Sequence, residues 1–114
     1  MIVRLPGSAP TRSRAVVHGG LVHTVAVSPD KAPSTYEQTK GALAAIDRSL
    51  AEAGTDKSRI LTATVFIADM AEKPAMNRAW DEWVSREDPP LRACLGVVLE
   101  GQDRVEIIVT AALP

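Results

Sequence analysis

The chain has 114 residues, 46% of them hydrophobic, and a formal net charge of −1 at pH 7. This length fits one ordinary domain, so we expect residues 1–114 to form a single domain. The charge provides no basic field for a nucleic acid, and the longest apolar runs are too short to span a membrane. The segment that begins at Met1 has no apolar core of signal-peptide length, which predicts a cytoplasmic protein. A single cysteine excludes an internal disulfide.

The first half of the sequence predicts a hairpin followed by a helix. Two β-rich runs, residues 15–18 and 20–27, surround Gly19-Gly20, a dipeptide typical of tight hairpin turns. Ser34 to Glu37 has the pattern of a capping box. Gly54 is a typical residue to end the helix that follows. Its apolar residues recur at helical spacing: Leu43, Ile46, Leu50 and Ala53.

The second half predicts a strand, a second helix and two further strands. Residues 59–68 are rich in β-branched side chains and are bounded by polar clusters. A helix begins near Asp69, with Pro74 in its first turn, and it ends before Pro89-Pro90. Strands follow at 91–99 and 104–112. The order β-β-α-β-α-β-β predicts an α+β fold with one mixed sheet and two helices packed on one face.

Apolar residues on both faces of the predicted strands indicate an oligomer. Residues 60–68, 95–99 and 105–112 all show this pattern. Because two helices can cover only one face of the sheet, something else must bury the second face. We expect another copy of the chain to do so, with the sheet faces packed inside the oligomer.

Two residues of unusual chemistry stand close together in the strand predicted at 91–99. Arg92 and Cys94 are two residues apart, so they share one face of the strand. An arginine in so apolar a strand is costly unless an anion pairs with it. Glu106 places a lone carboxylate in the strand predicted at 104–112. We interpret Arg92, Cys94 and Glu106, on what we expect to be neighbouring strands, as a small anion-handling site.

Each of these residues also has a purely structural interpretation. Arg92 could form an intersubunit ion pair without a ligand, and Glu106 could be a strand-edge charge or the partner of Arg92. Cys94 is expected to line the site, because the sequence places no histidine to activate it as a nucleophile. With one cysteine and no spaced partner, His18 and His23 make a poor metal site.

Several short segments of the chain follow one another in a specific order and spacing. They are Glu37-Gln38-Thr39, Leu50–Gly54, Asp56–Leu61, Thr64–Met70, Met76-Asn77, Pro90–Cys94 and Val105–Ile107. Together they resemble the RidA/YjgF family, which is also known as L-PSP endoribonuclease-like. The resemblance covers roughly residues 15–112.

This resemblance implies a chorismate-mutase-like fold and a homotrimer with clefts between its subunits. It also implies hydrolysis of reactive 2-imino and 2-enamino acids to 2-keto acids and ammonia. By position, Arg92 matches the arginine that binds the substrate carboxylate, and Glu106 matches the glutamate that positions the attacking water. Cys94 matches a cysteine that lines the site. Asn77 matches an asparagine of the cleft, although just inside a helix it could also face solvent. Nothing in the sequence requires a metal or an organic cofactor.

The chain departs from the family pattern at two places, which leaves a second hypothesis open. Val25-Ala26-Val27 stands where the family's deaminases usually have Ser-Gly-Gln, and the N-terminal segment lacks their tyrosine. Arg12 and Arg14 lie near the position of that tyrosine, where they either add positive potential to the cleft or, as we expect, are solvated charges. The second hypothesis is a regulatory module that binds a small carboxylic acid without turning it over. The ribonuclease role in the family's older name lacks the basic patch that it would need.

Overall fold

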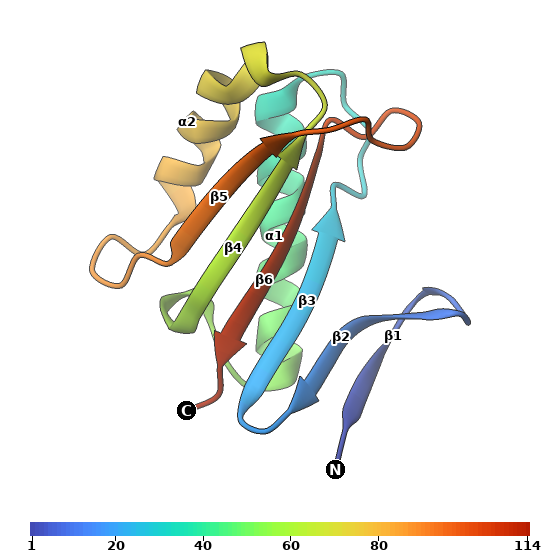
Figure 1. The fold of residues 1–114 in the computed structure, drawn as a ribbon, viewed down its shortest axis with the longest axis vertical. Coiled ribbons are helices and arrows are strands. Elements are labelled where there is room, and N and C mark those ends of the chain that lie inside the picture. The colour runs from blue at the N-terminus through green and yellow to red at the C-terminus, as the bar shows by residue number, and fades with distance from the viewer.

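Six strands form a single mixed sheet, and two helices pack against one of its faces (Figure 1). The computed structural model describes every residue from Met1 to Pro114. The helices are α1 (Thr35–Ala53) and α2 (Lys73–Trp83), and 3-10 turns lie at η1 (Lys57–Arg59) and η2 (Met70–Glu72). The strands are β1 (Val3–Ala9), β2 (Arg12–His18), β3 (Leu21–Val27), β4 (Ile60–Ile67), β5 (Leu91–Gly96) and β6 (Val105–Ala112). The predicted α+β class, with two helices on one face of a mixed sheet, is confirmed.

The strand order, β1-β2-β3-β6-β4-β5, brings together strands that are distant in the sequence. β4 and β5 run parallel, and every other neighbouring pair is antiparallel. The connection from β4 to β5 carries α2, because parallel neighbours need a long crossover. β6 lies between β3 and β4, so β4 separates β6 from β5.

α1 begins and ends where the sequence predicts. The Ser34 hydroxyl accepts a hydrogen bond from the Glu37 amide at 3.3 Å. Gly54 follows the helix with a φ of +93°, a left-handed conformation that glycine adopts at low cost. The predicted apolar stripe faces the sheet, and Ile46 and Leu50 in it are completely buried.

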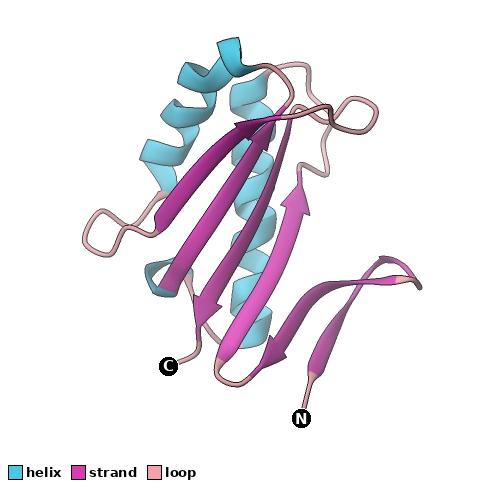
Figure 2. Cartoon of the chain, in the orientation of Figure 1, coloured by secondary structure: helices cyan, strands magenta, loops and turns pink.

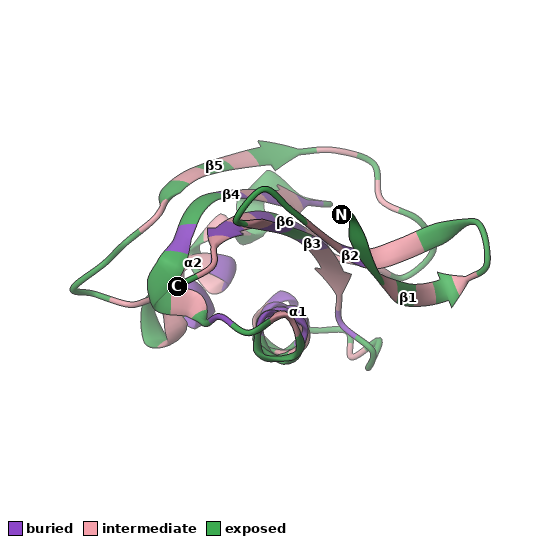
Figure 3. Cartoon of the chain, turned by 90° about the horizontal axis from the view of Figure 1, so that it is seen from below, coloured by how far each residue is buried: buried purple, intermediate pink, exposed green.

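The hydrophobic core lies between the two helices and the face of the sheet that they cover (Figure 3). Alternate residues of β4 and β6 point into it: Ala63, Val65, Ile67, Val105, Ile107 and Val109. Together with helix residues such as Ile46 and Met76, they belong to a cluster of 15 buried residues. Neither helix has both the length and the apolar composition needed to cross a membrane.

The opposite face of the sheet, here called the open face, has no second layer over it within the chain (Figure 3). Leu91, Leu95 and Ile108 point to it, because they pair with β4 residues that alternate with the buried ones. Their exposed fractions are 74%, 44% and 44%. The predicted second apolar face is therefore present, and in the single chain it is exposed to solvent.

β1 is a strand that the sequence pattern does not predict. The segment contains Pro6 and Gly7, and both residue types weaken a strand prediction. In the structure β1 is an edge strand, and its pairing with β2 changes register on both sides of Pro6. An edge strand tolerates proline at such an irregularity, because no neighbour needs the missing N–H. The observed order is thus β-β-β-α-β-α-β-β.

The other predicted elements agree with the structure, apart from their ends. Gly19 and Gly20 form the turn between β2 and β3, with φ angles of +60° and +79°. β2 begins at Arg12 instead of residue 15, because its first residues pair with β1. β5 ends at Gly96 instead of residue 99. α2 follows the turn η2, in which the Asp69 side chain accepts a hydrogen bond from the Ala71 amide.

We predict that Ile46→Ala lowers the free energy of unfolding by about 2–5 kcal/mol, because it leaves a cavity between α1 and the sheet. Arg48→Ala, at an exposed position of the same helix, should change the free energy by less than about 0.5 kcal/mol. Urea unfolding at one protein concentration measures both. Equal losses for the two variants would contradict the assignment of the core.

Candidate active site

Arg92 points from β5 toward α2, on the helix-covered side of the sheet. It pairs in register with buried Ala63 of β4. Its guanidinium carbon lies 5.2 Å from the centroid of the Trp80 ring, and its Nη1 lies 3.8 Å from the Met76 sulfur. The ion pairs of the chain join Arg14 to Glu52, Lys31 to Asp103 and Lys40 to Glu37. Arg92 is therefore a half-buried guanidinium with no carboxylate partner in its own chain.

Cys94 lies on the same face as Arg92, as the sequence predicts. It pairs with Val65 and packs at the edge of the hydrophobic core, half-buried. Neither histidine is bonded to it: His18 Nδ1 lies 3.1 Å from the Met1 carbonyl oxygen, and His23 Nδ1 lies 3.0 Å from the Thr110 hydroxyl. Cys94 thus lies two residues from Arg92 on the same face of β5.

Asn77 lies on α2, directly after the Met76 whose sulfur contacts Arg92. Its side-chain oxygen is buried and accepts no hydrogen bond. A buried acceptor without a donor is rare and costs roughly 1–3 kcal/mol. Asn77 therefore presents a hydrogen-bond acceptor that no group of the chain uses.

Glu106 lies on the other side of the sheet, and the prediction that it neighbours Arg92 is wrong. β4 lies between β5 and β6, so the two strands do not pair. Glu106 also alternates with the buried residues of β6, which places it on the open face beside Val27 and Phe66. Arg92 and Glu106 of one chain are thus separated by a strand and by the thickness of the sheet.

Glu106 borders a cavity of about 690 Å³ at the place where β2 leaves β3. The pairing of β2 with β3 ends at Ala15 and Thr24, beyond which β1 and β2 bend away from the sheet (Figure 2). The Thr24 hydroxyl donates to the Arg14 carbonyl at 2.8 Å. This bond replaces the next contact between the strands, and the Val25–Val27 edge of β3 is left facing the cavity.

Arg12 and Arg14 both line this cavity. Arg14 is an ion pair partner rather than a solvated charge, because its guanidinium lies 2.7 Å from Glu52 and donates to Ser49 at 2.9 Å. Arg12 is exposed, as expected for a solvated charge. The segment Val25-Ala26-Val27 gives the cavity an apolar wall.

The sequence patterns do not reveal the role of Trp80 in this site. Its helical spacing predicts only a core residue, and it is indeed 6% exposed. Its ring nevertheless faces the Arg92 guanidinium and supports it by a cation–π contact.

The chain therefore carries two separate groups of candidate site residues. We call Arg92, Cys94 and Trp80, together with Asn77 of α2, the arginine half, and Glu106 with the Val25–Val27 edge of β3 the glutamate half. The arginine half can bind a carboxylate, and the glutamate half can accept a proton from water. No three His, Cys, Asp or Glu side chains cluster as metal ligands would.

Comparisons with known proteins place this chain in one family. The family model described as Endoribonuclease L-PSP matches residues 6–113. A RutC family protein of Haemophilus ducreyi is 43% identical over 103 residues, which cover 89% of this chain and 88% of that protein. The RutC family protein YoaB of Escherichia coli K12 is 36% identical over 113 residues, which cover 98% of each.

A solved structure agrees with this match. NMB1025 of Neisseria meningitidis, described as a member of the YjgF protein family, superposes with a TM-score of 0.95. The two chains are 37% identical, and the match covers 100% of this chain and 96% of the other. The chain therefore belongs to the RidA/YjgF family, which also includes the RutC and L-PSP proteins.

Proposed function

We propose that this protein hydrolyses 2-imino and 2-enamino acids to 2-keto acids and ammonia, in clefts formed between copies of the chain. The observation that carries the proposal is the half-buried Arg92 guanidinium, which has no carboxylate partner and lies beside a helix with an unused acceptor, Asn77. This pair suits a small anion that also has an N–H group.

Binding begins at the arginine half. The planar guanidinium of Arg92 grips the substrate carboxylate with two parallel hydrogen bonds, which a neutral compound cannot form. Trp80 holds the guanidinium in place. The imine N–H then donates to the Asn77 side-chain oxygen, which satisfies the buried acceptor.

The chemical step belongs to Glu106. Its carboxylate takes a proton from a water molecule as the water oxygen forms a bond to the imine carbon, and the C=N electron pair moves to nitrogen. The proton passes to that nitrogen, which gives a tetrahedral carbinolamine. Glu106 then moves the hydroxyl proton to the nitrogen, the carbon–nitrogen bond breaks with its electron pair leaving on ammonia, and the oxygen left behind forms the C=O bond of the keto acid. Because imines are intrinsically labile, positioning and one proton-transfer group suffice.

A cleft between copies brings the two halves together. In one chain Arg92 and Glu106 lie on opposite faces of the sheet, so a complete site needs Glu106 from a second copy. The exposed apolar side chains of the open face support such an assembly, because exposed apolar surface on one face of a sheet is typical of an interface between chains. We propose the homotrimer that the family resemblance implies.

The second candidate function is a module that binds a keto acid without turning it over. The apolar Val25-Ala26-Val27 edge beside Glu106 favours it, because this edge offers no side-chain hydrogen bonds to orient a water molecule. Saturable keto-acid binding by a protein that does not accelerate imine hydrolysis would distinguish it from the deaminase.

We predict that the protein accelerates keto-acid release from imines that an amino-acid oxidase generates in situ, with semicarbazide as the competing trap. Arg92→Ala should lower kcat/KM roughly 30-fold or more, which corresponds to the loss of about 2 kcal/mol from a buried charge pair. Arg92→Lys should rescue little, since the ammonium cannot form the two parallel bonds. Full activity of Arg92→Ala would overturn the proposed role of this residue.

We also predict that Ile108→Lys disrupts the oligomer, because it places a charge in the middle of the open face. Light scattering should show a smaller species, and activity should fall although Arg92 and Glu106 are intact. The matched control is Ala44→Lys, which adds the same charge at an exposed position of α1. An Ile108→Lys protein of unchanged size and activity would contradict the proposed interface.

A further inference from the structure

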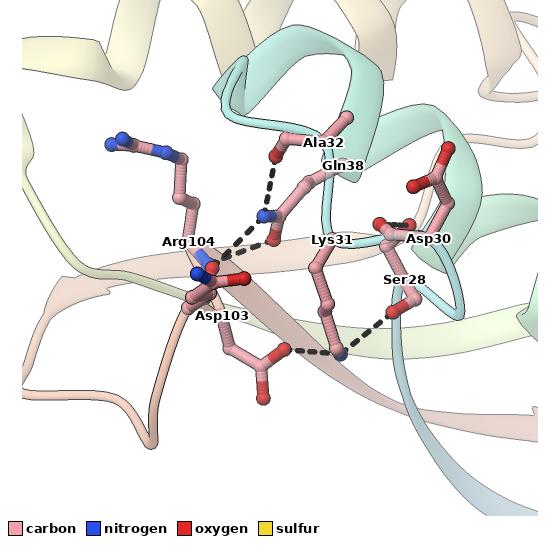
Figure 4. A network of polar contacts seen from close by, with 8 residues as sticks. Ser28, Asp30, Lys31, Ala32, Gln38, Asp103 and Arg104 are labelled. Carbon is pink, nitrogen blue, oxygen red and sulfur yellow. Dashed lines mark hydrogen bonds and ion pairs between the residues drawn. The ribbon is translucent and has the colours of Figure 1, made fainter.

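Gln38 is a completely buried polar residue at the start of α1. Its side-chain amide makes three hydrogen bonds to the neighbouring loops (Figure 4). Its Nε2 donates to the carbonyl oxygen of Ala32 at 2.7 Å and to that of Gln102 at 2.9 Å. Its Oε1 accepts from the backbone N–H of Arg104 at 2.8 Å. One side chain thus joins α1 to the loop before it and to the loop that leads into β6.

The backbone of Arg104 is held from two sides. Gln38 binds its N–H, and its carbonyl oxygen accepts a hydrogen bond from the amide of Ala68 at 3.0 Å. Glu106 follows two residues later in the same strand. The position at which β6 enters the sheet, and with it the position of Glu106, is therefore fixed by these contacts.

The strand on the other side of Glu106 is tied to the same network. Val27 pairs with Glu106, and the next residue, Ser28, accepts a hydrogen bond from Lys31 Nζ at 2.7 Å on its carbonyl oxygen. Lys31 also forms an ion pair with Asp103, in the loop before β6 (Figure 4). Ser28 also packs closely against α1, because a Cβ at Gly41 would lie 2.2 Å from the Ser28 hydroxyl oxygen. Both strands at the glutamate half are thus anchored to α1.

We propose that Gln38 is the positioning residue for Glu106. This inference rests on the proposed deaminase function. In the proposed reaction Gln38 touches neither the substrate nor the attacking water. It acts on Glu106 through its hydrogen bond with the backbone N–H of Arg104. Glu106 must meet a substrate that the arginine half of another copy holds, so a small shift of the β6 entrance separates the carboxylate from the reacting carbon. Misplacement by about 1 Å can cost roughly 100-fold in rate.

Glutamine suits this position better than residues of similar shape. It offers two donors for the two carbonyl oxygens and one acceptor for the amide. Methionine has nearly the same length and offers neither donor, and a glutamate would present acceptors to two carbonyl oxygens. Gln38→Met therefore removes the three hydrogen bonds while filling the same space.

The test compares kcat and KM of the whole protein, in the imine assay, for Gln38→Met, Lys31→Met and the control Thr55→Val. Thr55 is 8% exposed, and its hydroxyl donates at 2.7 Å to the carbonyl oxygen of Ala112, at the opposite end of β6. It anchors the same strand far from Glu106, so its loss should affect stability and leave kcat unchanged. Lys31 lies on the exposed rim of the network, which makes Lys31→Met the milder variant.

We expect Gln38→Met to lower kcat by roughly 10- to 100-fold and to change KM by less than about threefold, because Arg92 still binds the carboxylate. Lys31→Met should also lower kcat, by a smaller factor. If Gln38→Met does not fold, the kcat of Lys31→Met tests the positioning role instead. An active wild type whose Gln38 and Lys31 variants keep their kcat, or lose it no more than Thr55→Val does, would overturn the positioning role alone. A wild type that does not accelerate hydrolysis would overturn the proposed function together with this assignment.

Discussion

The constraint on which the whole site depends is that helices cover only one face of the sheet. Side chains alternate across each strand, so every residue of β4, β5 and β6 points either to the helices or to the open face. Arg92 points to the helices, and Glu106 points to the open face. The covered face supplies the core that stabilises the chain, and the open face retains exposed apolar side chains such as Leu91 and Ile108. Burial of these side chains favours association with another copy of the chain. In the proposed assembly the two halves of the site meet.

The rigidity of each half comes from a different helix. α2 places Trp80 and Met76 against the Arg92 guanidinium, which limits the conformations available to a long side chain. α1 holds the strands around Glu106 through Gln38. Preorganisation of this kind matters most for a reaction that needs little chemical assistance, because the enzyme then contributes mainly by placing the substrate and a water molecule. The side-chain oxygen of Asn77 has no donor in the free chain, and in the proposed function a bound substrate supplies one.

Local sequence signals predicted the helices and five of the six strands, because caps, turn glycines and apolar periodicity depend on near neighbours. These signals did not predict the strand β1, because Pro6 and Gly7 weaken the strand pattern of an edge strand whose register shifts. Strand order is a long-range property, so nothing near Arg92 or Glu106 indicated that β4 lies between them. The residues of the candidate site were found from the chemistry of Arg92, Cys94 and Glu106 and from the family resemblance. The roles of Trp80 and Gln38 could only come from the packing of distant elements.

The most direct test of the shared site mixes two inactive variants, Arg92→Ala and Glu106→Gln, unfolds them together and refolds them as mixed oligomers. Random assembly of equal amounts pairs an intact Arg92 with an intact Glu106 in about one cleft in four, so about a quarter of the wild-type activity should return. A mixture of Arg92→Ala and Asn77→Ala is the matched control, because both residues belong to the arginine half and no chain then supplies both. Recovery in the first mixture and none in the second is the result that a site shared between copies predicts. If the first mixture stays inactive while it forms oligomers of the wild-type size, Arg92 and Glu106 do not act in one cleft.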